Sequence, residues 1–348
     1  MKILGIETSC DETAAAVVED GVKILSNVVV SQIDIFAEYG GVIPEVAARS
    51  HLEAMMPVID KALSDASCGW DDIDAIAVTH APGLLGSLLI GTLTARTLAI
   101  LHDKPLYAVH HLKSHVYANW LSDHEPTFPL LALVVSGGHT QILYMPGHNQ
   151  FEIIGTTQDD AVGECFDKVA KILGLPYPGG PSIAKVALEG DADRYHLPHP
   201  KVAGLDFSFS GLKTAVLRAV QKEVGVPISY PSHKLKELLT PQQVCDFAAS
   251  FQKTAVGILC EKLELAVSQY PDVRSVVVAG GVSANEELRK IFVFRLGSRD
   301  LKGFFPDPSL SGDNGAMVAA AAYFEIQSGV KPTDPYSLNI YPRISIEN

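Results

Sequence analysis

Two histidines at helical spacing are the residues of this chain best suited to bind a metal ion. His111 and His115 are four positions apart, so on a helix they share one face. Two imidazoles at this spacing can hold a single ion. They follow a β-type run, 106–109, and α/β folds place ligand sites after strands. The neighbouring His110 adds a third imidazole, and the cluster favours a metal site over ordinary core or surface histidines, provided that a third ligand exists.

A carboxylate near the C-terminus is the candidate third ligand. Asp313 ends the open loop 305–313, shortly before a predicted helix, 317–328. An N-cap role would be a sufficient alternative explanation for an aspartate at such a junction. A His–His–Asp set leaves coordination positions open, which suits Fe(II) or Zn(II) bound for reactivity, whereas a closed structural zinc site has four ligands.

The strands that must position these residues follow a pattern that occurs twice. Each half has three predicted strands around one polar turn: 2–6, 14–18 and 23–30 around 7–13, then 129–135, 141–144 and 151–155 around 136–140. This arrangement resembles the two-lobed α/β plan of actin-like ATPases, sugar kinases and Hsp70-type proteins. In that plan, two duplicated RNase H-like halves face a central cleft.

The resemblance to that plan predicts how the chain is divided. We expect an N-terminal lobe at 1–107 and a C-terminal lobe at 108–316, with the metal and adenylate site facing the cleft. The C-terminal helical region, 317–348, is expected to pack back on the first lobe. In the second lobe, Gly137 and Gly138 allow backbone amides to approach an anion. The turn 280–285 follows a β-type run and ends in Asn285, which could hydrogen-bond a ribose or base.

Composition limits the function classes. The chain has 348 residues, 47% of them hydrophobic, and a net charge of −13 with a pI of about 5.3. A protein this acidic does not grip nucleic acid through its overall charge, so any RNA contact needs a local basic surface or a partner. Five scattered cysteines without a CxxC pair indicate a reduced, cytoplasmic protein. The longest apolar region, 84–101, contains Arg96 and polar residues, which favours a buried helix over a membrane span.

Ten segments, in order over nearly the whole chain, together resemble one family. They are GIETSCDET (5–13), GGVIPEVAARSH (40–51), PGLLGSLLIG (82–91), HHLKSH (110–115), VSGGHTQ (135–141), DDAVGECFDKVAK (159–171), YPGGP (177–181), FSFSGLKTA (207–215), GGVSANEELR (280–289) and SGDNGAM (311–317). The family is the tRNA N6-adenosine threonylcarbamoyltransferases of bacterial type, formerly called the O-sialoglycoprotein endopeptidase or glycoprotease family.

This resemblance implies a reaction. The family transfers threonylcarbamoyl from threonylcarbamoyl-AMP to N6 of the adenosine 3′ of the anticodon, in tRNAs that read codons starting with A, and releases AMP. It implies one divalent metal, Fe(II) or alternatively Zn(II), bound by His111, His115 and Asp313. Implied contacts to the adenylate are Val134, Val135, Ser136, Gly137, Gly138, Asp167, Gly180 and Asn285. Implied catalytic residues at the cleft are Asp11, Glu12 and His139, any of which could take the amine proton.

The resemblance also implies partners and exposes two departures. Besides tRNA, the expected partners are an inactive paralogue of the same fold, forming a heterodimer, and a small P-loop ATPase, with no membrane association. Many relatives have a cysteine two residues before the aspartate ligand, where this chain has Ser311. The polar segment 221–240 looks longer than usual and has no assigned role.

Three alternative functions compete with the transferase. A metalloprotease of the HExxH type needs a glutamate beside its first ligand, but Leu112 occupies that position. An ATP-dependent kinase or ATPase of the actin-like superfamily would hold Mg²⁺ through water and carboxylates, so two histidines argue against it. An inactive scaffold paralogue would not need the complete His–His–Asp set.

Overall fold

The computed structural model describes residues 1–122, 124–200, 202–297 and 301–347, which form two compact units. Unit 1 contains Met1–Phe128, Met145–Glu152 and Pro306–Asn348, and unit 2 contains Pro129–Tyr144 and Ile153–Phe305. The boundaries of these units differ from those of the lobes expected at 1–107 and 108–316. The chain crosses between the units several times, and both the histidine segment and the Asp313 loop belong to unit 1.

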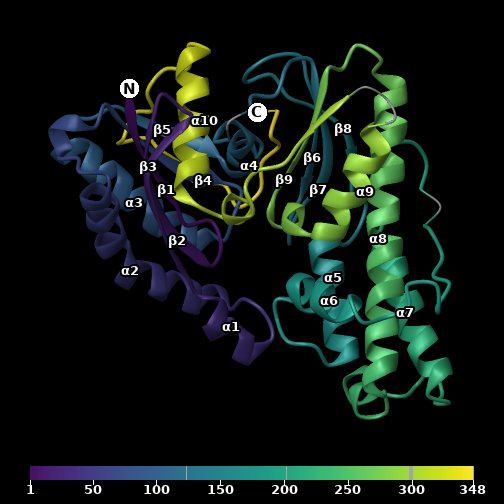
Figure 1. Ribbon diagram of the computed structural model, residues 1–348. Helices are drawn as coiled ribbons and strands as arrows, with labels where there is room; N and C mark the ends of the chain where they lie inside the picture. The colour runs from purple at the N-terminus through teal and green to yellow at the C-terminus, as the bar shows by residue number, and fades with distance from the viewer. Residues whose placement is uncertain (123, 201, 298–300, 348) are drawn as a thin grey trace. The chain divides into compact units, whose positions relative to one another are not determined.

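Unit 1 is built on a five-stranded sheet (Figure 1). Its strands run in the order β3-β2-β1-β4-β5, with β1 antiparallel to β2 and parallel to β4. The bounds are β1 (Lys2–Glu7), β2 (Glu12–Glu19), β3 (Lys23–Ser31), β4 (Ala75–Ala81) and β5 (Leu106–His110). Both faces of the central strands are covered, and β1, β2 and β4 are accordingly almost continuously buried.

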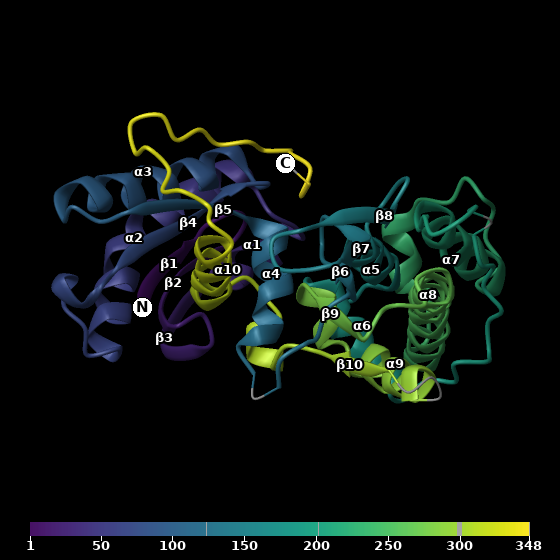
Figure 2. The same cartoon turned by 90° about the horizontal axis from the view of Figure 1, so that it is seen from above.

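Helices cover the two faces of this sheet differently. Leu4 and Ile6 of β1 point into a core shared with α2 and α3, while the intervening Gly5 contacts α10. Figure 2 shows strands β1 and β2 between α2 and α10. The helical elements of unit 1 are α1 (Ile33–Tyr39), α2 (Pro44–Asp65), η1 (Trp70–Asp72), α3 (Leu85–Leu101), α4 (His111–Tyr117), η2 (Ala118–Trp120), η5 (Pro308–Leu310) and α10 (Gly315–Gln327).

Unit 2 repeats the same topology. Its sheet has the order β10-β9-β6-β7-β8, which matches that of unit 1 when the first three strands, β6 to β8, are set against β1 to β3. The central β6 is parallel to β9, as β1 is to β4. The bounds are β6 (Leu130–Val135), β7 (Thr140–Met145), β8 (Glu152–Thr156), β9 (Ser275–Ala279) and β10 (Lys302–Phe304). The predicted duplication is therefore confirmed.

Helices of unit 2 pack around the long α8, visible in green in Figure 1. They enclose a large core that contains Phe166, Phe247 and Phe251. Their bounds are α5 (Val162–Leu173), α6 (Gly179–Ala187), α7 (Ser210–Glu223), η3 (Ser232–Glu237), α8 (Pro241–Gln269), η4 (Gly281–Ala284) and α9 (Glu286–Gly297). None of the helices in the described ranges has both the length and the apolar character needed to cross a bilayer.

Three segments noted in the sequence have defined local structure. Helix α5 starts at Val162, and Asp159, just before it, accepts hydrogen bonds from Ser208 and Ser210. Within the YPGGP segment, Gly179 begins α6. Within the segment 221–240, α7 continues to Glu223 and a 3-10 turn, η3, follows.

Candidate metal centre and glycine-lined site

The two histidines lie on α4, which starts where β5 ends. His110 closes β5 and caps the helix, because its Nδ1 accepts a hydrogen bond from the N–H of Leu112 at 3.2 Å. The helix therefore begins at His111, and the spacing of four brings His111 and His115 together with ring centroids 4.6 Å apart. Both imidazoles are buried, so the predicted shared face points into the protein.

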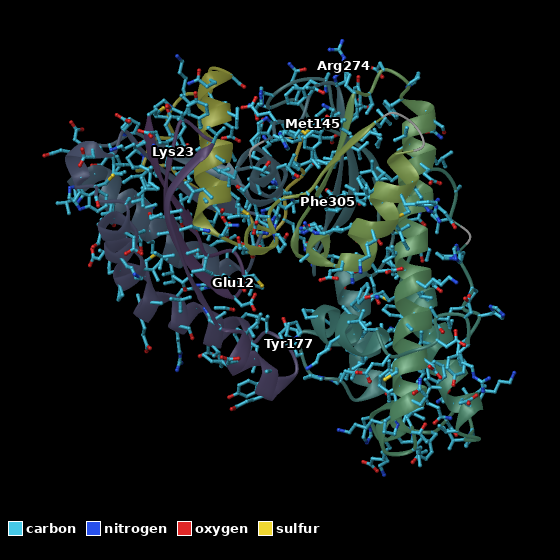
Figure 3. The ribbon with its side chains drawn as sticks, viewed as in Figure 1. Glu12, Lys23, Met145, Tyr177, Arg274 and Phe305 are labelled. Carbon is cyan, nitrogen blue, oxygen red and sulfur yellow. The ribbon has the colours of Figure 1, made fainter. Side chains whose placement is uncertain are left out.

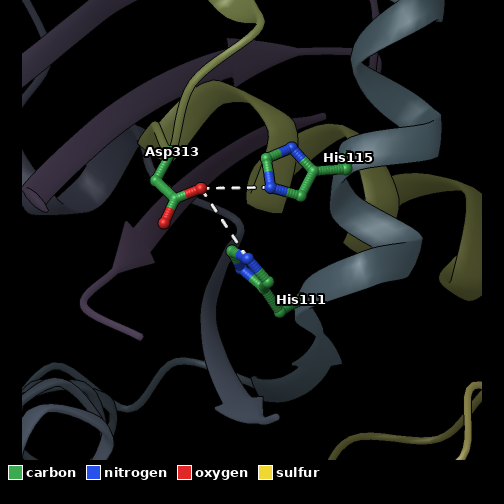
Figure 4. Close-up of side chains that lie close together, drawn as sticks. All are labelled: His111, His115 and Asp313. Carbon is green, nitrogen blue, oxygen red and sulfur yellow. Dashed lines mark ion pairs between the residues drawn. The ribbon is translucent and has the colours of Figure 1, made fainter. Parts of the chain in front are cut away.

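Asp313 lies in the loop before α10, and both imidazoles face its carboxylate (Figure 4). Its Oδ1 is 3.0 Å from Nε2 of His115 and 3.7 Å from Nε2 of His111. The alternative explanation of Asp313 as an N-cap is wrong. Asn314 is the cap of α10, because its Oδ1 accepts the hydrogen bond of the Met317 N–H. The helix end therefore does not account for the aspartate at position 313.

The donor set at this centre fits a divalent ion. One ligand atom from each of His111, His115 and Asp313 lies within 4.8 Å of the others. Ligand bonds of about 2.0–2.2 Å bring such atoms to similar separations around one ion. Nε2 of His115 is buried and, in the part of the chain that the structure describes, has no partner with hydrogen-bond geometry. A ligand bond to that nitrogen would remove the cost of leaving it unsatisfied.

Glu7 is the member of this centre that the sequence analysis missed. It ends β1, is fully buried, and its Oε2 lies 3.2 Å from Nδ1 of His111. Its carboxylate also accepts hydrogen bonds from the Thr79 hydroxyl and from the N–H of Ser9, both at 2.6 Å. With Nδ1 occupied, His111 presents Nε2 to Asp313. A carboxylate at the end of a buried strand is the sequence signal for Glu7, but Glu7 is also the first residue of the polar turn 7–13.

The two carboxylates beside His111 control its protonation. Burial by itself would lower the pKa of His111, but Asp313 and Glu7 raise it to about 9. Burial raises the pKa of Glu7, and the adjacent His111 outweighs this and lowers the pKa below its ordinary value. The two carboxylates therefore favour a positive charge at this position. A divalent ion would take the place of the proton on His111.

Asp11 ends the turn between β1 and β2, and Glu12, labelled in Figure 3, is the first residue of β2. Burial, with Asp313 and Asp11 nearby, raises the pKa of Glu12 well above its ordinary value. The turn itself is held by His51, whose ring contacts the Cys10 carbonyl at 2.9 Å and the Thr13 hydroxyl at 2.7 Å. Both predicted carboxylates therefore sit in unit 1, in a buried and firmly tethered turn.

His139 belongs to unit 2, where it ends the tight turn after β6. The N–H of Ser136 donates to the His139 carbonyl at 2.9 Å, and the N–H of His139 donates to the Ser136 hydroxyl at 3.2 Å. Between them, Gly137 and Gly138 are exposed, and a Cβ on either would meet nothing within 4 Å. Val134 and Val135, by contrast, are fully buried, so only their backbone faces this turn.

Close contacts at glycines join this turn to other residues that are predicted to bind the adenylate. A Cβ on Gly163 would lie 2.6 Å from the Ser136 carbonyl oxygen, so the start of α5 touches the turn directly. One helical turn later on α5, Asp167 accepts a hydrogen bond from the N–H of Gly179 at 2.7 Å. The adjacent Gly180 faces open space. The turn after β6 and the starts of α5 and α6 are thus adjacent in unit 2, and we call their exposed part, which includes Gly137 and Gly138, the glycine-lined surface.

Asn285 lies beyond the turn that follows β9. Gly280 opens this turn with φ of 89°, and a Cβ there would lie 2.5 Å from the Val135 carbonyl oxygen. The Asn285 side chain donates to Gln252 Oε1 at 2.8 Å and accepts from the N–H of Leu288 at 3.0 Å. Its side chain therefore helps to position α9, and Asn285 is also one of the residues predicted to contact the adenylate.

Solved structures with the same architecture place the fold. HypF from T. kodakarensis aligns with a TM-score of 0.60 and 15% identity, covering 94% of this chain and 48% of that one. Component A of (R)-2-hydroxyglutaryl-CoA dehydratase from Acidaminococcus fermentans aligns with a TM-score of 0.51 and 15% identity, covering 94% and 99%. Together with the duplicated strand order, these likenesses define a protein of the actin-like ATPase and sugar kinase fold.

Sequence relatives define the family. The model of the tRNA N6-adenosine threonylcarbamoyltransferase family matches residues 23–320. A tRNA N6-adenosine threonylcarbamoyltransferase from Symbiobacterium thermophilum is 49% identical over 99% of this chain and 96% of its own length. One from Caldicellulosiruptor bescii is 46% identical over 99% and 98%. The chain belongs to the tRNA N6-adenosine threonylcarbamoyltransferase family and is an enzyme of the transferase class.

Proposed function

We propose that this chain transfers threonylcarbamoyl from threonylcarbamoyl-AMP to N6 of the adenosine 3′ of the anticodon, in tRNAs that read codons starting with A. The observation that carries the proposal is the His111–His115–Asp313 centre, in a chain that matches relatives of this activity along nearly its whole length. The acyl donor is a mixed anhydride, so the amine attacks the carbamoyl carbon and AMP leaves with the bonding electrons of the broken bond.

The metal centre would contribute to this reaction through the positive charge of a bound ion. Two neutral imidazoles and one carboxylate would leave a bound Fe(II) or Zn(II) with net positive charge, which polarises the donor's carbonyl or phosphate. Glu7 fixes the ring of His111 through Nδ1, so that Nε2 keeps its direction toward the ion. The burial of His115 shields the centre from water on that side.

The adenylate is assigned to the glycine-lined surface of unit 2. Backbone amides of Gly137 and Gly138 suit a phosphate, because a Cβ is missing at both positions and neither is covered. Asp167 and Asn285 lie beside that surface and supply polar groups for a ribose, base or threonyl part. Val134, Val135, Ser136 and Gly180 complete the proposed contacts.

Proton removal from the amine falls to Asp11, Glu12 or His139. Each lies at a polar turn after the first strand of its sheet. A base with a pKa near the working pH accepts a proton most effectively. Glu12 lies near Asp313 and Asp11, and burial together with these carboxylates raises its pKa well above its ordinary value.

Protein partners and a cytoplasmic location belong to the same proposal. The expected partners are an inactive paralogue of the same fold and a small P-loop ATPase. Leu85, Leu89 and Leu93 follow one face of α3 and are 57%, 44% and 45% exposed, which supports a protein partner on unit 1. Free cysteines are compatible with the reducing cytoplasm, in which tRNA is modified.

The decisive test combines the purified chain, its partners, preformed threonylcarbamoyl-AMP and unmodified tRNA. We expect AMP and modified adenosine to appear in equal amounts, as followed by chromatography and nucleoside mass spectrometry. Fast ATP turnover by this chain alone would instead support a kinase or ATPase. AMP release without any modified nucleoside in the presence of tRNA would contradict the transfer.

A further inference from the structure

The acidic charge of this chain is confined to one of its two units. Unit 1 contains 9 Lys and Arg against 23 Asp and Glu, a net charge of −14. Unit 2 contains 18 Lys and Arg against 17 Asp and Glu, a net charge of +1. A polyanion is therefore repelled by unit 1 and meets no net repulsion from unit 2.

Within unit 2, cations gather in the segment that had no assigned role, together with the helix that leads into it. From Arg218 to Thr240 the chain has five cationic or imidazole side chains and two carboxylates, Glu223 and Glu237. We call these five residues the basic segment, and they are Arg218, Lys222, His233, Lys234 and Lys236. All five side chains are exposed.

The segment is folded against its neighbours, so its charges have fixed positions. Arg218 donates to the Ile228 carbonyl at 3.2 Å, and Gln221 donates to the carbonyls of Ile228 and Tyr230 at 3.0 and 3.2 Å. A Cβ on Gly174, at the end of α5, would meet the Lys236 side chain. Three elements, α5, α7 and η3, are thus in mutual contact, and α5 adds the exposed Lys171.

These cations are not neutralised by carboxylates. No ion pair involves Lys171, Arg218, Lys222, Lys234 or Lys236 among the pairs found in the described ranges. Among the other exposed lysines of unit 2, Lys253 is paired with Asp193 and Lys290 with Glu286, whereas no ion pair of Lys185 or Lys302 is found in the described ranges. A competing account is that some of these lysines only stabilise helix ends, since Lys171 and Lys222 lie in the last turns of α5 and α7.

We propose that the basic segment, together with Lys171, binds the phosphate backbone of tRNA. The inference rests on the proposed function, because the polyanion it names is the acceptor substrate of that reaction. Exposed and unpaired Lys and Arg side chains are the groups that bind nucleic-acid phosphates, and they do so without reading sequence. The segment thereby supplies the local basic surface that an acidic chain needs.

The test replaces three lysines of the segment and leaves Arg218, which stabilises its fold, unchanged. The variant Lys222→Gln, Lys234→Gln, Lys236→Gln is compared with a matched control, Lys23→Gln, Lys61→Gln, Lys331→Gln, in unit 1. Both lose the same charge from exposed positions. Binding of unmodified tRNA to the chain with its partners is measured from low to high salt, and steady-state kinetics give the KM values for tRNA and donor.

We expect the segment variant to bind tRNA at least tenfold more weakly than the control. The slope of log affinity against log salt should shrink by about 0.7–0.9 for each tRNA phosphate that the variant no longer neutralises. The KM for tRNA should rise, with kcat and the KM for the donor unchanged. Equal tRNA affinity and equal salt slopes in both variants would overturn the inference, and loss of thermal stability alone would assign the lysines to helix ends. Failure of the wild-type complex to modify tRNA would instead refute the proposed function, since the binding comparison does not require turnover.

Discussion

The carboxylate of Glu7 holds Nδ1 of His111 at 3.2 Å, although the two residues are 104 positions apart in the chain. This contact links the end of the first strand to the first residue of the histidine helix. Thr79, on the neighbouring strand β4, donates to the same carboxylate oxygen of Glu7. The orientation of a proposed metal ligand is therefore set by the central strands of the sheet.

Replacing Glu7 by Gln should weaken metal binding while leaving the three ligands intact. The amide keeps the size of the side chain but loses the charge that orients His111 and favours its ligand role. Loss of such a partner typically costs 10–100-fold in metal affinity. Calorimetric titration of Zn(II) or anaerobic Fe(II) into the apo-protein measures this. Glu19→Gln, at the far end of β2, should bind as the wild type does, and an unchanged affinity in Glu7→Gln would contradict the orienting role.

Removing both imidazoles should abolish metal binding. His111→Ala combined with His115→Ala leaves one carboxylate, which cannot hold an ion with useful affinity at micromolar concentration. Elemental analysis of the purified variant should find no stoichiometric metal, and threonylcarbamoyl transfer should be lost. His124→Ala, which removes an exposed histidine of the same unit, is the control. Stoichiometric metal in the double variant would place the ion elsewhere.

A methyl group at Gly315 should strain the packing of α10 on the sheet. A Cβ there would lie 2.5 Å from the backbone nitrogen of Ala16, and backbone atoms cannot give way as a flexible side chain can. We expect Gly315→Ala to lower the free energy of unfolding by about 1–3 kcal/mol, with weaker metal binding because Asp313 is two residues away. Gly312→Ala, where a Cβ meets nothing within 4 Å, should be close to neutral in calorimetry. Equal melting temperatures for the two variants would refute the packing argument.

The buried Glu325 should make stability depend on pH. Burial raises the pKa of Glu325 from 4.5 to about 7, and Lys113, with Nζ 3.9 Å from Oε1, offsets this only in part. Since the folded state binds this proton more tightly than the unfolded state, the contribution of Glu325 is fully present below pH 4.5. It is lost as the pH rises to about 7.

Glu325→Gln removes that dependence, because an amide has no proton to lose. At pH 8 we expect the variant to be more stable than the wild type by on the order of 1–3 kcal/mol, and the two should converge near pH 5. Melting temperatures measured across this range by calorimetry test the sign. Glu53→Gln, on the exposed side of α2, is the control. Destabilisation at pH 8 would show that the Lys113 pair outweighs burial.

Most elements and the shared face of the two histidines could be predicted because they depend on local patterns. Apolar runs next to polar turns predicted most strands of both sheets, though not β10, and the spacing of His111 and His115 predicted a shared face. Asp313 could be proposed because it lies in an open loop at the junction with a predicted helix. Its neighbour Asn314 could not be identified as the cap, since either side chain has the oxygen that capping needs.

Long-range contacts could not be predicted from local sequence patterns. Glu7 could not be distinguished from the other polar residues of its turn, because its role depends on Thr79 and His111, each more than 70 positions away. The boundaries of the two units escaped prediction for the same reason. The segments Met145–Glu152 and Pro306–Asn348 return to unit 1 after the chain has entered unit 2, and no composition shift marks these crossings.

The return of the last segment to unit 1 has a consequence for synthesis on the ribosome. Both histidines leave the exit tunnel roughly 200 residues before Asp313, and every residue of unit 2 is translated before the last segment of unit 1. A nascent chain therefore displays two imidazoles and Glu7 without the carboxylate that completes the set. Asp313 can join the two imidazoles only after all of unit 2 has been translated.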